Sequence, residues 1–142
     1  MSKYCGIMIP IDDEVPRRVL AIYAHPDDCE VACGGTIASW KRQGAHVEVA
    51  VLTSGDKGTS DDQLDSRSLV QHRKAEMERS AEILCINYRH FFDLPDGSLN
   101  AGDVDLEALV VSLLRRVRPD TVVCPDPSAL FFGQRYINHC TH

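Results

Sequence analysis

A histidine and three carboxylates lie close together in the run H-P-D-D-C-E at residues 25–30. Imidazole nitrogens and carboxylate oxygens bind Zn²⁺ and other divalent metals, and carboxylates also accept protons from water. The run follows the apolar stretch Arg18–Ala24, which is typical of a buried strand, and it leads into a helix predicted over Glu30–Gln43. Open parallel sheets bind ligands at the carboxyl ends of their strands, so metal or proton chemistry is expected here.

Helix capping is an alternative explanation for this run. Aspartate is a favoured N-cap, proline suits the first helical turn, and acids near a helix N-terminus complement the helix dipole. Capping gives no reason for His25 and does not require both Asp27 and Asp28. Taken alone, the run is compatible with either capping or metal binding.

A second histidine cluster closes the chain, where His139 and His142 stand in an H-x-x-H spacing. By itself this spacing is more typical of a surface or a tail. In a doubly wound sheet, however, loops that follow separate strands converge on one crevice, where these histidines could meet His25 and Asp28. Two histidines, one aspartate and a water form an open zinc site, and the two clusters together favour one.

The segments between the clusters alternate between strand and helix patterns. Strands are predicted over Arg18–Ala24, His46–Thr53, Tyr88–Asp93 and Thr121–Cys124, and helices over Glu30–Gln43, Arg67–Cys85 and Asp103–Arg118. In the second of these helices, Val70, Met77, Ala81 and Leu84 are predicted to share the buried face. The alternation predicts an α/β fold, a Rossmann-like three-layer sandwich with a mostly parallel sheet.

Composition narrows the class of protein. A chain of 142 residues with 44% hydrophobic and 25% charged residues is typical of a soluble globular domain. The net charge of −6 without a lysine or arginine block argues against a nucleic-acid partner, and no apolar stretch is long enough to span a membrane. The six cysteines form no C-x-x-C pair, so we expect reduced thiols in a cytoplasmic protein.

A nucleotide-binding protein of the Rossmann type is an alternative from a different class. The turn after the first predicted strand lacks G-x-G-x-x-G. It also carries acidic residues where a pyrophosphate would need bare backbone amides. Both features disfavour nucleotide binding.

The string A-H-P-D-D-x-E at residues 24–30, with Gly34-Gly35 in the following helix, resembles the zinc-dependent N-acetylglucosaminyl deacetylases of the PIG-L or LmbE-like family. Weaker motifs follow in the family's order: T-S-G-D at 53–56, R-x-x-E at 73–76, L-P-D-G at 94–97, P-D-P at 125–127 and the final H-x-x-H. The resemblance implies removal of an N-acetyl group from an N-acetylglucosamine-type sugar or glycoconjugate. It also implies Zn²⁺, or another divalent metal, as the cofactor.

The resemblance gives each matching residue a role. His25, Asp28 and His142 match the family's three metal ligands. Asp27 matches the general base that takes a proton from the metal-bound water. His139 matches the residue that steadies the oxyanion or protonates the departing amine. If His25 is a ligand, its other ring nitrogen needs a hydrogen-bond partner, which the sequence does not identify.

Arg73 has two interpretations. Its spacing favours a solvated helix charge or a surface pair with Glu76, and its alternative role is to clamp a substrate hydroxyl or phosphate. Glu30 is expected to support the helix start rather than to bind metal. The remaining histidines, His46, His72 and His90, show no ligand-like spacing with the site and are expected to be structural. Trp40 is expected to pack or to lie at the surface rather than to form a platform for a sugar.

The chain departs from the family pattern near its end. Thr141 stands where the family usually carries an aspartate, and relatives continue for several strands and helices beyond this point. We therefore expect residues 1–142 to be a single, truncated domain, with 1–17 as an N-terminal extension and the C-terminal part of the fold missing. A catalytically silent domain that binds metal or a partner is the alternative to an active hydrolase.

Overall fold

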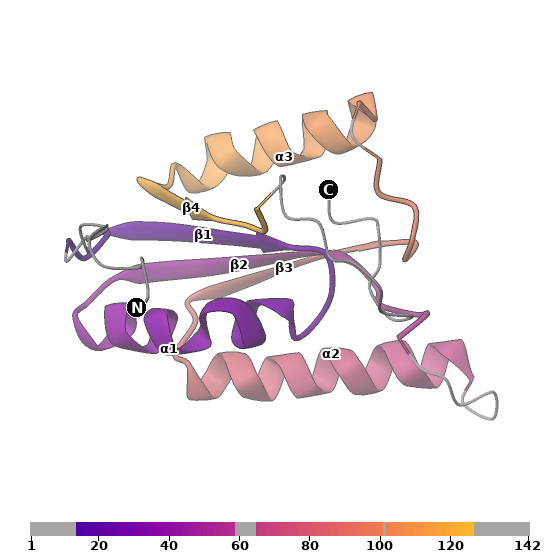
Figure 1. Ribbon diagram of the computed structural model, residues 1–142, viewed down its shortest axis with the longest axis horizontal. Helices are drawn as coiled ribbons and strands as arrows, with labels where there is room; N and C mark the ends of the chain where they lie inside the picture. The colour runs from indigo at the N-terminus through magenta and orange to yellow at the C-terminus, as the bar shows by residue number, and fades with distance from the viewer. Residues whose placement is uncertain (1–13, 59–64, 101, 127–142) are drawn as a thin grey trace, which may run out of the picture.

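Four parallel strands form the central sheet in the computed structural model, which describes residues 14–58, 65–100 and 102–126. The strands are β1 (Arg18–Tyr23), β2 (His46–Thr53), β3 (Tyr88–Leu94) and β4 (Thr121–Val123), in the order β3-β2-β1-β4. Helices α1 (Asp28–Arg42) and α2 (Ser66–Ile83) cover one face, and α3 (Val104–Val117) covers the other (Figure 1). The predicted three-layer α/β sandwich with a parallel sheet is confirmed.

Each face of the sheet has its own apolar core. Towards α1 and α2, Val19 and Ala21 of β1 pack in one cluster with Ile37. Towards α3, Leu20 packs in a second cluster with Leu113. Strands buried on both faces need a nearly continuous apolar sequence, which explains why β1 lacks the polar alternation of a half-exposed strand. At the carboxyl end of β1, Tyr23 belongs to the first cluster and Ile22 packs against the second, so helices anchor this end on both sides.

The predicted elements are confirmed, with boundaries shifted by at most two residues. The buried face predicted for α2 is partly wrong, because Leu69 rather than Val70 is buried with Met77 and Ala81. These three residues are separated by multiples of four, which places them along one line of the helix. Trp40 packs against the core, as expected for a structural residue.

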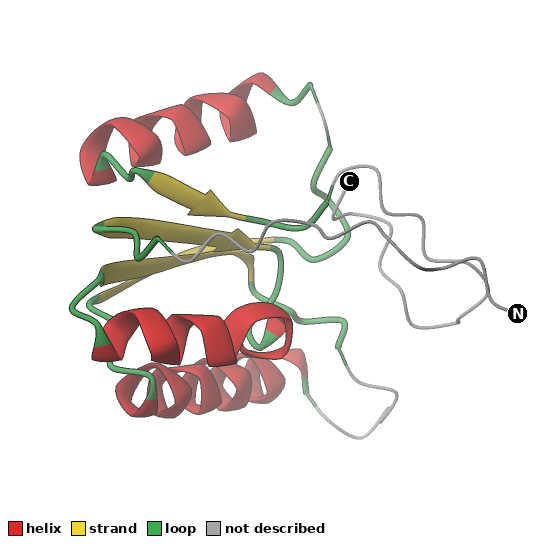
Figure 2. Cartoon of the chain, turned by 60° about the vertical axis from the view of Figure 1, so that its left-hand side comes forward, coloured by secondary structure: helices red, strands yellow, loops and turns green. Residues whose placement is uncertain are grey.

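The strand order reverses beside β1: β2 and β3 lie on one side of it, and β4 lies on the other. β1 pairs with β2 on one side and with β4 on the other, and the α1 and α3 crossovers lie on opposite faces. In such sheets the ligand crevice forms at the carboxyl ends of the strands, where the order reverses. Figure 2 shows the loops that leave this end of the sheet. Residues 24–27 form the loop that leaves β1 there, and residues 28–30 are the first turn of α1.

A buried network on the α3 side of the sheet involves two of the histidines expected to be structural. The carboxylate of Glu48 lies 2.8 Å from Nε2 of His90 and 2.9 Å from Nε2 of His46. Arg116 of α3 donates to Nδ1 of His90 over 3.0 Å. Burial alone would raise the pKa of Glu48, but the hydrogen bonds from His90 and His46 outweigh burial and lower it.

We expect Glu48→Gln to reduce the free energy of unfolding at neutral pH, and the deficit to shrink as the pH falls. The lowered pKa means that the unfolded chain binds the Glu48 proton more tightly than the folded chain does. The stabilisation is therefore complete above the ordinary pKa of 4.5 and is lost as the pH falls through the lower, folded value. Urea unfolding of both proteins over this range measures it, with the exposed Glu107→Gln as control. A deficit that does not change with pH would contradict the expectation.

Two further findings concern the predicted class of protein. Among the described residues, Cys29, Cys33, Cys85 and Cys124 form no disulfide bond. In the part of the chain that the structure describes, no helix is long and apolar enough to cross a membrane.

Candidate metal and active site

The loop after β1 turns sharply at Asp27, and α1 begins at the next residue. Asp27 has φ 98° and ψ −26°, in the left-handed region that residues with a Cβ seldom occupy. Its side chain makes no capping hydrogen bond, and Asp28 turns its carboxylate back to accept the His25 N–H over 2.9 Å. Helix capping therefore does not account for this pair of aspartates. Unusual backbone of this kind often accompanies functional sites.

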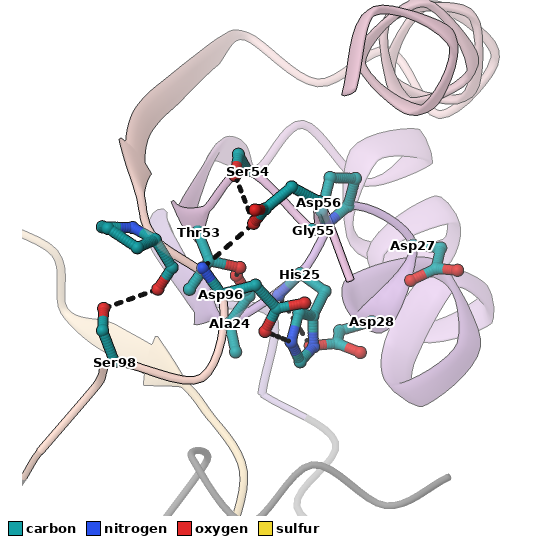
Figure 3. A network of polar contacts seen from close by, with 12 residues as sticks. Ala24, His25, Asp27, Asp28, Thr53, Ser54, Gly55, Asp56, Asp96 and Ser98 are labelled. Atoms are coloured by element: carbon teal, nitrogen blue, oxygen red, sulfur yellow. Dashed lines mark hydrogen bonds and ion pairs between the residues drawn. The ribbon is translucent and has the colours of Figure 1, made fainter. Parts of the chain in front are cut away.

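Two carboxylates fix the ring of His25. Its Nδ1 lies 3.2 Å from Oδ2 of Asp28, and its Nε2 lies 2.9 Å from Oδ1 of Asp96 (Figure 3). The side chains of His25 and Asp96 are only 14% and 3% exposed. The hydrogen bond with Asp28 is the largest cause of a raised pKa of His25, burial acts against the rise, and the contact with Asp96 adds to it.

Asp96 reaches His25 from the loop after β3, although β2 separates β3 from β1. The backbone N–H of Asp96 donates to Oδ1 of Asp56 over 3.1 Å, and the same oxygen accepts from the hydroxyl of Ser54 over 2.9 Å. The loops after β1, β2 and β3 are thus joined at one point (Figure 3). The L-P-D-G motif contains Asp96, but it signals only a turn, so sequence reasoning missed this partner of His25.

His25 and Asp28 fit a zinc ion as part of its ligand set. Their 3.2 Å separation is close to the roughly 3.3 Å between two ligand atoms of a tetrahedral zinc ion with bonds of about 2.0 Å. A carboxylate on the second ring nitrogen, as Asp96 provides, commonly orients a metal-binding histidine. Among residues 14–58, 65–100 and 102–126, no group of three or more His, Cys, Asp or Glu side chains is arranged so that it could hold a metal ion. The other predicted site histidines, His139 and His142, lie outside the described residues.

We expect Asp96→Asn to weaken zinc binding about 10- to 100-fold, the usual effect of losing a partner that orients a ligand. The side-chain amide of asparagine carries no negative charge, so it holds the His25 ring less strongly than the Asp96 carboxylate does, and the orientation of the ring is less fixed. Competition with a fluorescent zinc chelator measures the affinity. Asp93→Asn is the matched control, because Asp93 lies at the end of β3 with its side chain 55% exposed. Equal affinities of the Asp96→Asn variant and the wild type would contradict this role.

Arg73 of α2 is mostly buried between two loops of the site. Its Nη2 donates to Oδ1 of Asp27 over 3.0 Å and to the carbonyl of Pro26 over 2.8 Å. Its Nη1 donates to the carbonyl of Gly55 over 3.1 Å. The side chain of Arg73 is 16% exposed, whereas that of Asp27 is 66% exposed. Arg73 therefore ties α2 to the loops after β1 and β2 and holds one oxygen of Asp27.

A cleft of about 230 Å³ lies beside this arginine, and its lining includes Asp27, Glu30, Arg73 and Glu76. Glu76 pairs with His72 over 3.3 Å, so the surface pair between Arg73 and Glu76 favoured by spacing is not what the structure shows. Among the described residues, neither carboxylate oxygen of Glu30 has a hydrogen-bond partner, and both are buried.

Glycines make the space that the guanidinium of Arg73 occupies. Gly55 has φ 66°, and a Cβ added to it would lie 2.5 Å from Nη1 of Arg73. A Cβ on Gly58 would also collide with this nitrogen. Gly55 and Gly58 therefore leave room for the Arg73 side chain in addition to forming the turn.

We expect Gly55→Ala to destabilise the protein by more than the ~1–2 kcal/mol that left-handed backbone costs a residue with a Cβ, because the new methyl also displaces Arg73. Gly44→Ala is the matched control, since Gly44 has φ 94° and a Cβ there would meet nothing within 4 Å. Urea unfolding of both variants measures the difference. Equal losses of stability would contradict the proposed crowding of Arg73.

Comparison with known proteins gives consistent matches. The family model for PIG-L, described as GlcNAc-PI de-N-acetylase, matches residues 20–142. Diacetylchitobiose deacetylase of Thermococcus kodakarensis is 37% identical over 111 residues, which cover 78% of this chain and 41% of the relative. The structure of N,N′-diacetylchitobiose deacetylase from Pyrococcus horikoshii matches with a TM-score of 0.80 and 30% identity, over 89% of this chain and 46% of that one.

One similar structure has a different named activity. GalB, the 4-carboxy-2-hydroxymuconate hydratase from Pseudomonas putida, matches with a TM-score of 0.67 and 29% identity, over 78% of this chain and 49% of its own. The chain thus spans less than half the length of each of these three relatives. The motif at the end of β1, the parallel sheet behind it and a family match from residue 20 to residue 142 agree, and the chain belongs to the PIG-L family.

Proposed function

We propose that this protein is a zinc-dependent hydrolase that removes an N-acetyl group from an N-acetylglucosamine-type sugar or glycoconjugate. The observation that carries the proposal is the 3.2 Å approach of His25 Nδ1 to Asp28 Oδ2, with Asp27 beside them at the strand end. The deacetylases of Thermococcus and Pyrococcus, whose names give diacetylchitobiose as the substrate, support the acetylated amino sugar as the substrate class.

We assign the metal to His25, Asp28 and His142. Nitrogen and oxygen donors with one exchangeable position suit Zn²⁺, although another divalent metal is compatible with the same donors. When bound, Zn²⁺ lowers the pKa of a water and polarises the acetyl carbonyl. Asp28 brings a negative charge to the ion, and Asp96 keeps the His25 ring in the orientation that leaves Nδ1 towards Asp28.

Asp27 is assigned as the general base. Its carboxylate is accessible, and the hydrogen bond from Arg73 to Oδ1 limits its movement. A carboxylate held in this way can take the proton of the attacking water. His139 is assigned the proton transfer to the departing amine, because an amide nitrogen leaves poorly as an anion.

Arg73 is proposed to border the substrate site. It lines the cleft beside Asp27, and its positive charge suits a hydroxyl or phosphate of the substrate. Its hydrogen bonds to Asp27 and to two backbone carbonyls make positioning of the base its first task. Free thiols at Cys29 and Cys33 favour a cytoplasmic location.

Acetate release tests the proposal. The 142-residue chain is loaded with zinc and supplied with N-acetylglucosamine, N,N′-diacetylchitobiose and GlcNAc-PI. Release by the wild type and its loss in Asp27→Asn would support the hydrolase. One bound zinc without turnover would instead support the catalytically silent domain. Because of GalB, 4-carboxy-2-hydroxymuconate is included, and addition of water to it without acetate release would favour a hydratase.

A further inference from the structure

Two cysteines lie one helical turn apart behind the candidate site, and the proposed function does not use them. The Sγ atoms of Cys29 and Cys33 are 3.8 Å apart. Cys29 is 1% exposed and belongs to the core between α1 and the sheet, whereas Cys33 is only half-buried. One thiol is thus shielded, and the other is closer to solvent.

The backbone of α1 is irregular at this pair. Cys33 has φ −144° and ψ 15°, which interrupts the helix, and Gly34 and Gly35 follow it. Glycine in a helix interior costs about 1 kcal/mol relative to alanine. Among the described residues, close packing does not require these two glycines. A Cβ added to Gly35 would meet nothing within 4 Å, and a Cβ added to Gly34 would meet only Cβ of Glu30, at 4.0 Å. The glycines leave the backbone free to adjust beside Cys33.

The contacts around the pair give the two thiols different reactivity. The hydrogen bond between the two sulfurs lowers the pKa of Cys33 to about 7, a bond from the hydroxyl of Tyr23 over 3.6 Å adds to this, and burial opposes it. In its thiol form, Cys33 donates to the backbone carbonyl of Cys29 over 3.3 Å. Cys29 is shielded in the core, whereas Cys33 is closer to solvent and therefore to a reagent. Thiolates are the nucleophilic form of cysteine, so Cys33 is the reactive member.

We propose that Cys29 and Cys33 form an oxidation site that closes to a disulfide when the protein meets a hydroperoxide. The Cys33 thiolate attacks a peroxide oxygen, the O–O bond breaks, and hydroxide leaves while Cys33 becomes a sulfenic acid. The sulfur of Cys29 then attacks the sulfur of Cys33, the S–O bond breaks, and the hydroxyl leaves as water with the Cys29 proton. With hydrogen peroxide, two thiols are oxidised and two waters form. A small dithiol reverses the reaction.

The two sulfur atoms lie close enough that a small movement brings them to bonding distance. A disulfide needs its sulfurs at about 2.05 Å, its Cα atoms within roughly 4.4–6.8 Å and its Cβ atoms within about 3.5–4.5 Å. Residues four apart in a helix satisfy the Cα condition, but their Cβ atoms lie about 5–6 Å apart, so the backbone must move for the bond to form. The sulfurs start at 3.8 Å, and the interruption of the helix at Cys33 is the place where the backbone can make the remaining movement. The proposal needs no metal and is independent of the proposed deacetylation.

Peptide mass spectrometry tests the proposal directly. Tryptic cleavage after Arg18 and Lys41 releases one peptide that holds both cysteines and no other. The folded chain is treated with limiting hydrogen peroxide in the presence of a metal chelator, and free thiols are then alkylated. We expect this peptide to lose two hydrogen atoms, to resist alkylation and to recover both thiols after dithiothreitol.

Single variants separate the two roles. Cys29→Ser, or Cys29→Ala if the buried hydroxyl prevents folding, is expected to stop the reaction at a sulfenic acid on Cys33 that dimedone traps. Cys33→Ser should give neither product in this peptide. The control Cys85→Ser, at an exposed thiol, should form the disulfide as the wild type does. The proposal is overturned if the wild-type peptide keeps two alkylatable thiols while Cys85 is oxidised, or if Cys33 stays a trappable sulfenic acid with Cys29 present.

Discussion

Replacement of Asp27 with Asn is expected to lower acetate release by about 10²–10⁴-fold, the usual contribution of a general base. The amide has the shape of the carboxylate but cannot take a proton from water. The loop should survive the change, because asparagine tolerates the left-handed backbone at φ 98° and its amide oxygen can still accept from Arg73. The loss should therefore fall on the rate rather than on folding or metal content.

Initial rates, zinc content and urea unfolding of the Asp27→Asn variant measure these three properties separately. Asp105→Asn is the matched control, since Asp105 is likewise an exposed aspartate at the start of a helix. An Asp27→Asn variant that keeps the wild-type rate would exclude Asp27 as the base. A variant that loses its zinc would mean that Asp27 holds the metal instead.

Asp28→Asn is expected to weaken zinc binding by more than about 100-fold, beyond the range for groups that only orient a ligand. The substitution removes the negative charge from an atom 3.2 Å from Nδ1 of His25. A second effect is expected in the metal-free protein. The hydrogen bond with Asp28 is the largest cause of the raised pKa of His25, and burial acts to lower this pKa. The pKa of His25 should therefore fall when residue 28 becomes neutral, because less opposes the effect of burial.

Zinc titration and an NMR pH titration of the His25 ring measure the two effects of Asp28→Asn. Asp93→Asn, at an exposed surface pair with Lys74, serves again as the control. If the variant binds zinc as tightly as the wild type, Asp28 is not a ligand. If the pKa of His25 does not fall, the contact between the two side chains is absent in solution.

The sequence predicted those parts of the fold that depend on local pattern. The apolar run of β1 and the amphipathic helix α3 carry period and capping signals within a few residues. Asp103, for example, accepts from the backbone N–H of Asp105 and Leu106 at the start of α3. The contact between His25 and Asp28 is also local, because it spans only three residues along the chain.

The remaining features of the candidate site depend on contacts between distant segments. Asp96 meets His25 across 71 positions of sequence, and Arg73 meets Asp27 across 46. Neither pairing leaves a periodic signal, because each requires loops from separate strands to converge at the end of the sheet. Helical spacing instead favoured a surface pair for Arg73. The left-handed backbone of Asp27 was equally hidden, since aspartate there reads as an ordinary N-cap.

The position of a bound zinc ion tests the central claim most directly. Crystals of the chain grown with zinc would be measured at the zinc absorption edge, so that anomalous scattering locates the ion without assumptions about its ligands. We predict a peak within about 2.0–2.2 Å of His25 Nδ1 and of the Asp28 carboxylate. A peak at the Cys29–Cys33 pair or near Glu48, or no bound zinc at all, would contradict the assignment of His25 and Asp28 as metal ligands.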